Sequence, residues 1–219
     1  MKGYNIFCIF ALKKKKKMND KEINNNGYKY ADLDLPSRTL WAAQNVGASK
    51  PSDFGLYFQW GDTVGYTADQ VGKDKQFTWK DYKFSINGSD TNFSKYTKEG
   101  AILDLEDDAA HVHMGVDWHM PTHKQIKELI DSTTSEWITV DGVGGMKFTS
   151  KKDESKSIFI PAAGNAWDGC LSHIGISGYV WSSTLYYFRY GKYLYFLYGN
   201  VYLNSYARYG GRSVRGVIG

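Results

Sequence analysis

Four histidines lie close together in the middle of the sequence, and metal binding is the first chemistry they suggest. They are His111, His113, His119 and His123, with Asp107, Asp108 and Asp117 nearby. Histidine and carboxylate side chains together can bind zinc. The spacing argues against it, because His111 and His113 would lie on different faces of a helix, and Pro121 separates His119 from His123. The sequence therefore favours solvated or core-edge histidines and no metal site.

Cys170 and His173 are the second candidate for chemistry, as a thiol nucleophile with a neighbouring base. A loop this short seldom gives the required geometry, and no acidic residue follows in the chain to orient His173. Cys170 is better explained as a small buried thiol. The glycine-rich segment 142–145 lacks the strand-to-helix context of a phosphate loop and is typical of a hairpin turn. These patterns predict no enzyme, no metal site and no cofactor.

The C-terminal part of the chain has the composition of a binding surface. Residues 179–209 contain ten of the 17 tyrosines, interspersed with Ser, Asn, Gly and Arg. Antibody paratopes share this composition, because Tyr provides rigid, amphipathic contact area. An alternating strand cannot bury every residue of 186–190, so several of these aromatic side chains must face outward. Two alternatives are a tyrosine-rich face packed on itself and a stacking platform for single-stranded nucleic acid.

We expect two kinds of position in this segment. Frame residues should be buried or should turn the chain; they are Trp181, Leu194, Phe196, Gly199, Val201, Gly211 and Val214. Displayed residues should bind the ligand; they are Tyr186, Tyr187, Phe188, Arg189, Tyr190, Tyr193, Tyr195, Tyr198, Tyr202, Asn204, Ser205, Tyr206, Tyr209 and Arg212. The alternation of residues 193–196 between Tyr and apolar residues predicts one outward and one inward strand face.

Charge is unevenly distributed along the chain, whose formal net charge is +4. From Gly169 to the end there are five basic and no acidic residues, whereas residues 18–168 are acidic on balance. Such an asymmetry has either a partner or a geometric cause. Together with the tyrosines it predicts a protein or glycoprotein surface as the ligand, one that presents carboxylates and is bound without metal. A specific nucleic-acid partner is not expected.

The elements that must position this surface are those of an α+β fold, with two helices, antiparallel strands and long loops. Strands are expected at 28–33, 40–46, 148–149, 157–161, 178–183, 193–198 and 213–217. Residues 50–100 should be long loops pinned by Trp60, Trp79 and Tyr82. One helix is expected at 104–112. A second should start at Thr122, where Gln125 completes a capping box and residues 126–130 provide an apolar stripe.

The N-terminal residues 1–26 are expected to be a disordered leader, or to precede a true start at Met18. Residues 27–219 should then form a single domain whose variable segment is about 179–215. The apolar stretch 4–12 has the length of a signal-peptide core, but five lysines follow it and no small-residue cleavage site does. No apolar run reaches the roughly 18 residues that a transmembrane helix needs.

Several motifs, in order along the chain, resemble a domain common in Bacteroidetes and their phages, of the Fibrobacter succinogenes major paralogous domain type. They lie at 32–42, 45–48, 53–62, 107–110, 115–122, 158–164, 181–183 and 211–215. The resemblance covers about residues 28–219. The family resembles the formylglycine-generating-enzyme type of C-type lectin fold and includes variable proteins of diversity-generating retroelements. One departure is His119, which stands where the family usually has Arg.

The resemblance implies a non-enzymatic binding protein, on a phage virion or a bacterial cell surface, whose C-terminal segment is rewritten at template adenines. A randomised AAC codon can encode Tyr, Phe, Ser, Arg, Gly, Leu or Asn, but not Trp, Met, Lys, Glu or Gln. Residues 182–219 contain no Trp, Met, Glu or Gln, and Lys192 is the only Lys. Two alternatives stay open: a metal-independent glycan-binding lectin, and an oxidase of the formylglycine-generating type, for which Cys170 has no partner cysteine.

Overall fold

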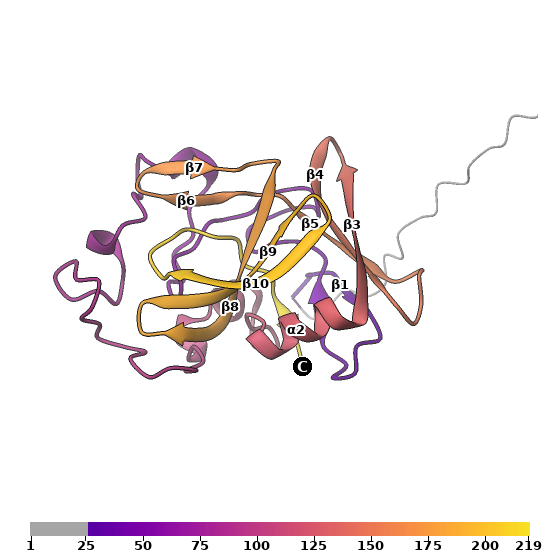
Figure 1. Cartoon of the computed structure of the whole chain (residues 1–219), viewed down its shortest axis with the longest axis horizontal. Coiled ribbons are helices and arrows are strands. Elements are labelled where there is room, and N and C mark those ends of the chain that lie inside the picture. The colour runs from indigo at the N-terminus through magenta and orange to yellow at the C-terminus, as the bar shows by residue number, and fades with distance from the viewer. Residues whose placement is uncertain (1–25) are drawn as a thin grey trace, which may run out of the picture.

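The computed structural model describes residues 26–219. The predicted leader therefore lies outside the described residues, apart from Asn26. The described chain is an α+β protein, as predicted, with two α-helices and antiparallel strands arranged in small sheets (Figure 1). The helices are α1 (Ala109–Met114) and α2 (His123–Ser132). No helix within residues 26–219 has both the length and the apolar character needed to cross a membrane.

The first sheet brings the two ends of the described chain together. Its strands are β1 (Tyr30–Asp32), β2 (Leu40–Ala42) and β11 (Val217–Ile218), with β2 in the centre. Trp41 in β2 is opposite Ala31 on one side and Val217 on the other, and it is fully buried. The sequence predicted the first two strands. The predicted strand at 213–217 is formed only at its last residue.

Two further sheets consist of hairpins in chain order. One contains β3 (Thr133–Val140), β4 (Val143–Ser150) and β5 (Ser157–Pro161). The other contains β8 (Ser177–Tyr187), β9 (Tyr190–Leu197) and β10 (Asn200–Ala207), with β9 in the centre. A two-stranded hairpin, β6 (Asn165–Trp167) and β7 (Cys170–Ser172), precedes this last sheet. The β8–β10 sheet therefore carries most of the tyrosine-rich segment.

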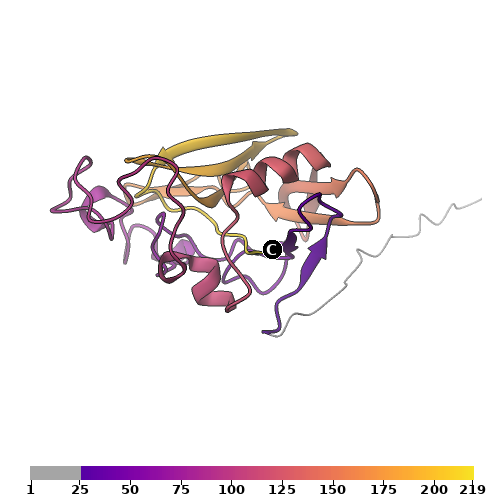
Figure 2. The same ribbon diagram turned by 90° about the horizontal axis from the view of Figure 1, so that it is seen from below.

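Helix α2 begins where the sequence predicts, at a complete capping box. The Thr122 hydroxyl accepts a hydrogen bond from the Gln125 N–H at 3.3 Å, and the Gln125 side-chain oxygen accepts one from the Thr122 N–H at 2.9 Å. Ile126 and Leu129 are fully buried in a core cluster that also contains Leu194 from β9. Figure 2 shows the helix lying alongside the β8–β10 sheet. Helix α2 thus covers one face of that sheet.

The first helix does not run continuously over 104–112 as predicted. A 3-10 turn, η3 (Leu105–Asp107), is followed by a break at Asp108, and only then by α1. Asp108 has an extended backbone, and its carboxylate accepts hydrogen bonds from the His111 N–H at 3.0 Å and the Met120 N–H at 2.7 Å. This buried carboxylate thus caps α1 and joins it to the segment at Met120, and the helix begins only after residue 108.

Residues 50–100 are long loops, as predicted, and they project from one side of the molecule (Figure 1). Their regular structure is limited to two 3-10 turns, η1 (Ala68–Gln70) and η2 (Trp79–Asp81), and isolated bridges. Trp60 and Tyr82 are buried, and the Tyr82 hydroxyl donates to the Trp60 carbonyl at 2.9 Å. Packing of large aromatic side chains therefore fixes these loops, which have no continuous backbone hydrogen-bond ladder.

Two large apolar clusters enclose the β8–β10 sheet near its centre. The first contains Val180, Leu194 and Phe196 on the side of α2. The second contains Trp60, Trp181 and Tyr193 on the opposite side. Strand β9 is therefore covered on both faces at its middle, and the exposed side chains of this sheet lie on β10, at the end of β8 and in the turn between β9 and β10.

Candidate functional site

A row of tyrosines crosses one face of the β8–β10 sheet. Tyr179, Tyr195 and Tyr202 are neighbours in register on β8, β9 and β10. The ring centroids of Tyr179 and Tyr195 are 5.0 Å apart, and those of Tyr195 and Tyr202 are 6.0 Å apart and nearly parallel. Paired residues point to the same side of a sheet, and Tyr206 on β10 lies on this side as well. We call Tyr179, Tyr195, Tyr202 and Tyr206 the tyrosine face.

Exposure increases from the centre of the sheet to its edge and its hairpins. Tyr202 and Tyr206 on the edge strand β10 are 48% and 38% exposed, whereas Tyr195 is half-buried. Tyr186 and Tyr187 end β8 and are also exposed.

Tyr198 is the most exposed tyrosine of residues 26–219, at 62%, and it lies in the turn at the far end of β9. The centroid of its ring lies 4.9 Å from that of the Trp137 ring. We expected the exposed tyrosines to share one face, and they do not. Tyr198 packs on Trp137, which belongs with the core cluster on the α2 side, whereas Tyr202 and Tyr206 lie on the tyrosine face.

Other expected display residues connect this segment to the long loops. Arg189 forms an ion pair with Asp90 at 2.6 Å. The Phe188 ring packs 6.2 Å from that of Phe93, and the Tyr209 ring lies 4.9 Å from that of Trp79. Among the remaining positions, Asn204 is exposed, and Tyr190 and Ser205 are half-buried. Phe188, Arg189 and Tyr209 thus have structural partners, whereas Asn204 faces solvent.

Two residues expected on the displayed surface are buried instead. Tyr193 is 5% exposed and Arg212 only 2%. The Arg212 guanidinium carbon lies 4.2 Å from the ring centre of Tyr193 and 4.2 Å from that of Trp181. The alternation of β9 places Tyr193 on the outward side correctly, but the returning C-terminal segment covers that side at this point. Tyr193 and Arg212 therefore belong to the buried layer beneath the tyrosine face.

Three arginines of the basic C-terminal segment are buried, so its positive charge has a geometric cause. They are Arg208, Arg212 and Arg215, and no ion pair of residues 26–219 includes any of them. Arg208 stacks on Phe93, with its guanidinium carbon 3.9 Å from the ring centre. Burial lowers the pKa of Arg212 to about 10 and that of Arg215 to about 9, so both stay charged at neutral pH.

Arg215 and Arg212 differ in how their donors are used. The Arg215 Nε donates to the Asn45 side-chain oxygen at 3.0 Å, and its two Nη atoms donate to the carbonyls of Ala42 and Phe159 at 2.9 and 3.1 Å. The Nε and Nη1 atoms of Arg212 are buried without a hydrogen-bond partner. Arg215 therefore holds the fold together, while Arg212 keeps unused donors.

A cavity of about 200 Å³ lies between the tyrosine face and the β6–β7 hairpin. Its lining residues are Asn165, Trp167, His173, Tyr179, Tyr193, Tyr206 and Arg212. We call it the Arg212 cavity. The side-chain oxygen of Asn165 is buried there without a hydrogen-bond partner. The cavity thus offers both donors and an acceptor between aromatic walls.

Sequence reasoning missed four of these lining residues, namely Asn165, Trp167, His173 and Tyr179. Trp167 precedes Asp168 and Gly169, both of which have positive φ and form the turn between β6 and β7. Trp167 lies next to this turn on a two-stranded hairpin and is 38% exposed. That turn was the available signal for a second wall beside the tyrosines.

A second cavity of about 250 Å³ lies at the start of α2, lined by His123, Tyr186, Lys192, Leu203, Asn204 and Ser205. The Nδ1 atom of His123 is buried without a hydrogen-bond partner. Burial, with help from the charges of Lys192 and Lys127, lowers the pKa of His123, which favours its neutral form. This cavity places Lys192 among the displayed residues Tyr186, Asn204 and Ser205.

The other histidines contact the backbone. A ring nitrogen of His111 lies 3.2 Å from the Trp118 carbonyl, one of His113 lies 2.8 Å from the Thr63 carbonyl, and one of His119 lies 3.0 Å from the Met120 carbonyl. Cys170 is exposed on β7, so the expectation of a buried thiol was wrong. The two-stranded β6–β7 sheet has no further layer to cover that residue.

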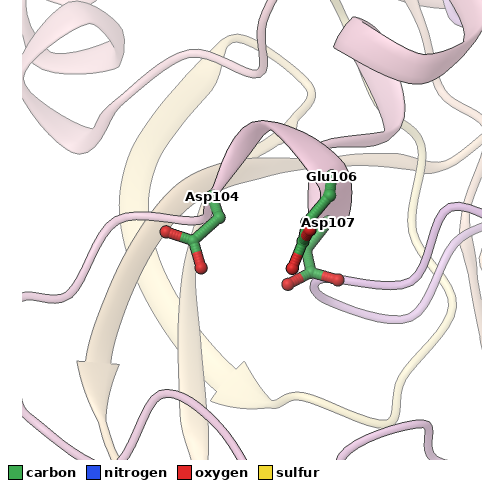
Figure 3. Close-up of side chains that lie close together, drawn as sticks. All are labelled: Asp104, Glu106 and Asp107. Atoms are coloured by element: carbon green, nitrogen blue, oxygen red, sulfur yellow. The ribbon is translucent and has the colours of Figure 1, made fainter.

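Within residues 26–219, one group of side chains has the spacing of metal ligands, namely Asp104, Glu106 and Asp107 (Figure 3). The Lys95 ammonium lies 2.6 Å from Asp104, 2.9 Å from Glu106 and 2.5 Å from Asp107. Lys83 also pairs with Asp107 at 2.6 Å. Lysine therefore already neutralises these carboxylates, and they form an ion-pair network.

No protein-family model, no curated protein and no solved structure matches this chain.

Proposed function

We propose that this protein is a non-enzymatic, receptor- or adhesion-type ligand-binding protein that presents a tyrosine-rich surface on a C-type-lectin-like scaffold. One observation carries the proposal: Tyr202 and Tyr206 are 48% and 38% exposed on the same side of β10, where Tyr202 is paired with Tyr195. Exposed aromatic residues gathered in one region mark interaction surfaces. Tyr is also the residue that paratopes use most for contact area.

The buried layer supports a division between frame and display. The indole N–H of Trp181 donates to the Phe58 carbonyl at 2.8 Å, and that of Trp60 donates to the Ser182 carbonyl at 2.9 Å. Gly191 packs its backbone directly on Trp60. These contacts fix the sheet through residues that the ligand would not touch. Exchange of the exposed side chains would then alter the ligand without altering the fold.

The finer proposal is a variable protein of a diversity-generating retroelement, acting on a virion or a bacterial cell surface. It is supported by the placement of Tyr and Asn at outward positions of β10. In that strand, Tyr202, Asn204 and Tyr206 are exposed, while Val201 and Leu203 pack against the core beside α2. Residues that a randomised AAC codon can encode thus occupy the outward positions.

The proposed ligand is a protein or glycoprotein surface, bound mainly through tyrosine contacts. Charge contributes less than the composition suggested, because Arg208, Arg212 and Arg215 are buried and Arg189 is paired with Asp90. Ion pairs at a surface are screened over about 8–10 Å at physiological ionic strength. Binding should therefore weaken only moderately with salt, unlike a contact with many phosphates, which falls by roughly 10³-fold or more between 50 and 200 mM salt.

The DNA around the coding sequence tests the retroelement origin. We expect a near-copy of the 3′ coding end, beside a reverse transcriptase, that differs from it only at adenines. The differences should fall on codons for Tyr187, Tyr202 and Tyr206 and should spare those for Trp181 and Phe196. A locus without such a copy, or with differences spread over buried positions, would refute this origin.

A further inference from the structure

Arg212 is a buried cation to which residues 26–219 supply no counter-charge. Its side chain is 2% exposed, and two of its nitrogen atoms, Nε and Nη1, have no hydrogen-bond partner. Removing a charged group from water costs several kcal/mol unless it is paired and hydrogen-bonded. The rings of Trp181 and Tyr193 interact favourably with the guanidinium face, and the Tyr193 side chain also forms a hydrogen bond with Arg212, but Nε and Nη1 are left without an acceptor. The edge of the guanidinium is therefore the unsatisfied part.

That guanidinium lines the Arg212 cavity. Tyr179 and Tyr206 also line the cavity, with their ring centres 5.7 and 5.3 Å from the guanidinium carbon. The other side of the cavity is formed by Trp167, at the end of β6, and by His173, which directly follows β7. A small group that enters from solvent would meet aromatic walls first and the cation beneath them.

The polar atoms of the cavity define the chemistry of the missing group. The guanidinium has several N–H donors in a planar arrangement that matches the two oxygens of a carboxylate. The unpartnered Asn165 oxygen needs a donor as well. Phosphate at neutral pH offers mainly acceptor oxygens, whereas an acidic amino-acid residue brings a carboxylate together with its own main-chain N–H.

We propose that the Arg212 cavity binds an aspartate or glutamate side chain of the protein ligand, with Arg212 as its counter-ion and Asn165 accepting a main-chain N–H. This inference rests on the proposed function, and it adds an ion-pairing position beneath the tyrosine contacts. A carboxylate enclosed by aromatic walls is shielded from solvent, so its pairing with Arg212 is less screened by salt than a surface ion pair.

The test titrates the full chain with N-acetyl-aspartate N-methylamide as the probe. Binding is monitored by the chemical shift of the Trp167 indole N–H in NMR spectra. We expect a saturable shift of that signal, and no saturable shift with N-acetyl-asparagine N-methylamide, the neutral isostere. Arg212→Met should weaken probe binding about tenfold or more, since it removes a charge-assisted pair. Arg38→Met, which removes an exposed cation outside the cavity, should leave probe binding unchanged.

Asn165→Leu is a second variant that keeps the test valid if Arg212→Met does not fold. It should weaken binding of the aspartate probe about fivefold, by the loss of one hydrogen bond. It should leave binding of acetate unchanged, because acetate has no N–H donor.

Three results would overturn the proposal. They are no saturable shift with the aspartate probe, equal binding of the neutral isostere, and equal binding of inorganic phosphate. Tighter binding of glucuronate than of the aspartate probe would overturn the protein source and assign the cavity to an acidic glycan. Failure of this test is distinguishable from failure of the proposed function, which is measured at the exposed tyrosines outside the cavity, Tyr187 and Tyr198.

Discussion

The guanidinium of Arg212 lies 4.2 Å from the ring centre of Trp181, beneath the tyrosines that the sheet presents to solvent. Tyr193 is at the same distance on another side of the cation. The site is therefore layered, with exposed tyrosines outside, a buried cation beneath them and the tryptophan core below. Arg212, which the sequence predicts on the displayed surface, therefore connects that surface to the core.

The two buried arginines should respond differently to the same substitution. Arg215→Met leaves the Asn45 side-chain oxygen and two carbonyls without donors, so we expect it to lower the free energy of unfolding by about 3 kcal/mol or more. Arg212→Met loses ring contacts but also removes an unpaired buried charge, so its effect should stay within about 1–2 kcal/mol. Urea denaturation measures both, and equal losses would contradict the distinction between them.

Substitutions at frame positions should lower the free energy of unfolding more than substitutions at display positions. Trp181→Ala should destabilise the protein by about 3–5 kcal/mol, because it empties a fully buried aromatic site and removes a hydrogen bond to Phe58. Tyr187→Ser and Tyr198→Ser should each cost at most about 1.5 kcal/mol, because each loses one aromatic neighbour. Thermal unfolding monitored by circular dichroism compares them. Similar costs at all three positions would rule out the division.

Gly191 tests how closely the sheet packs on the loops. A Cβ atom at this position would lie 2.6 Å from Cδ1 of the buried Trp60 ring. Gly191→Ala should therefore cost about 1–3 kcal/mol through overpacking. Lys192→Ala is the matched control on the adjacent residue, whose side chain points to the other face, and it should change stability by about 0.5 kcal/mol or less. A neutral Gly191→Ala would show that the loop is not fixed at Trp60.

The acidic network should make stability depend on pH. Burial acts to raise the pKa of Asp107, but hydrogen bonds from Lys83, Lys95 and Tyr96 outweigh it, so the pKa is lowered. A carboxylate with a lowered folded pKa adds stability above its unfolded pKa, near 4, and loses it as pH falls through the folded value. Asp107→Asn should cost about 1–3 kcal/mol at pH 7 and should reduce the stability loss below pH 4. Glu154→Gln, at an exposed position, should change the stability at pH 7 by about 0.5 kcal/mol or less.

Local signals predicted the parts of the fold that depend on neighbours in sequence. The capping box at Thr122 and Gln125 predicted the start of α2, and the apolar run at 157–161 predicted β5. The break before α1 was not predictable, because Asp108 caps that helix while bonding Met120, twelve residues away.

The displayed surface was predictable only in part. Composition and alternation identified the tyrosine-rich segment and the outward side of β9, including Tyr195. They could not show that Arg212 returns to cover that side at Tyr193, nor that the β6–β7 hairpin brings Trp167 beside it. Those are long-range contacts. The sequence signals the turn after Trp167 but not the place where that hairpin packs. The fold also buries Arg208, Arg212 and Arg215, which carry most of the positive charge of the C-terminal segment.

Binding by the exposed tyrosines is the central claim, and one comparison tests it most directly. The probe is an array of purified bacterial surface proteins and glycans, applied to the wild type and to Tyr187→Ser/Tyr198→Ser/Tyr202→Ser/Tyr206→Ser. A matched control carries serine at four exposed apolar residues elsewhere, Val64, Leu105, Val112 and Val116. We predict that the wild type and the control bind the same ligand, and that the tyrosine variant loses about tenfold or more in affinity while remaining folded. Full binding by the tyrosine variant, or no ligand for the wild type, would contradict the account.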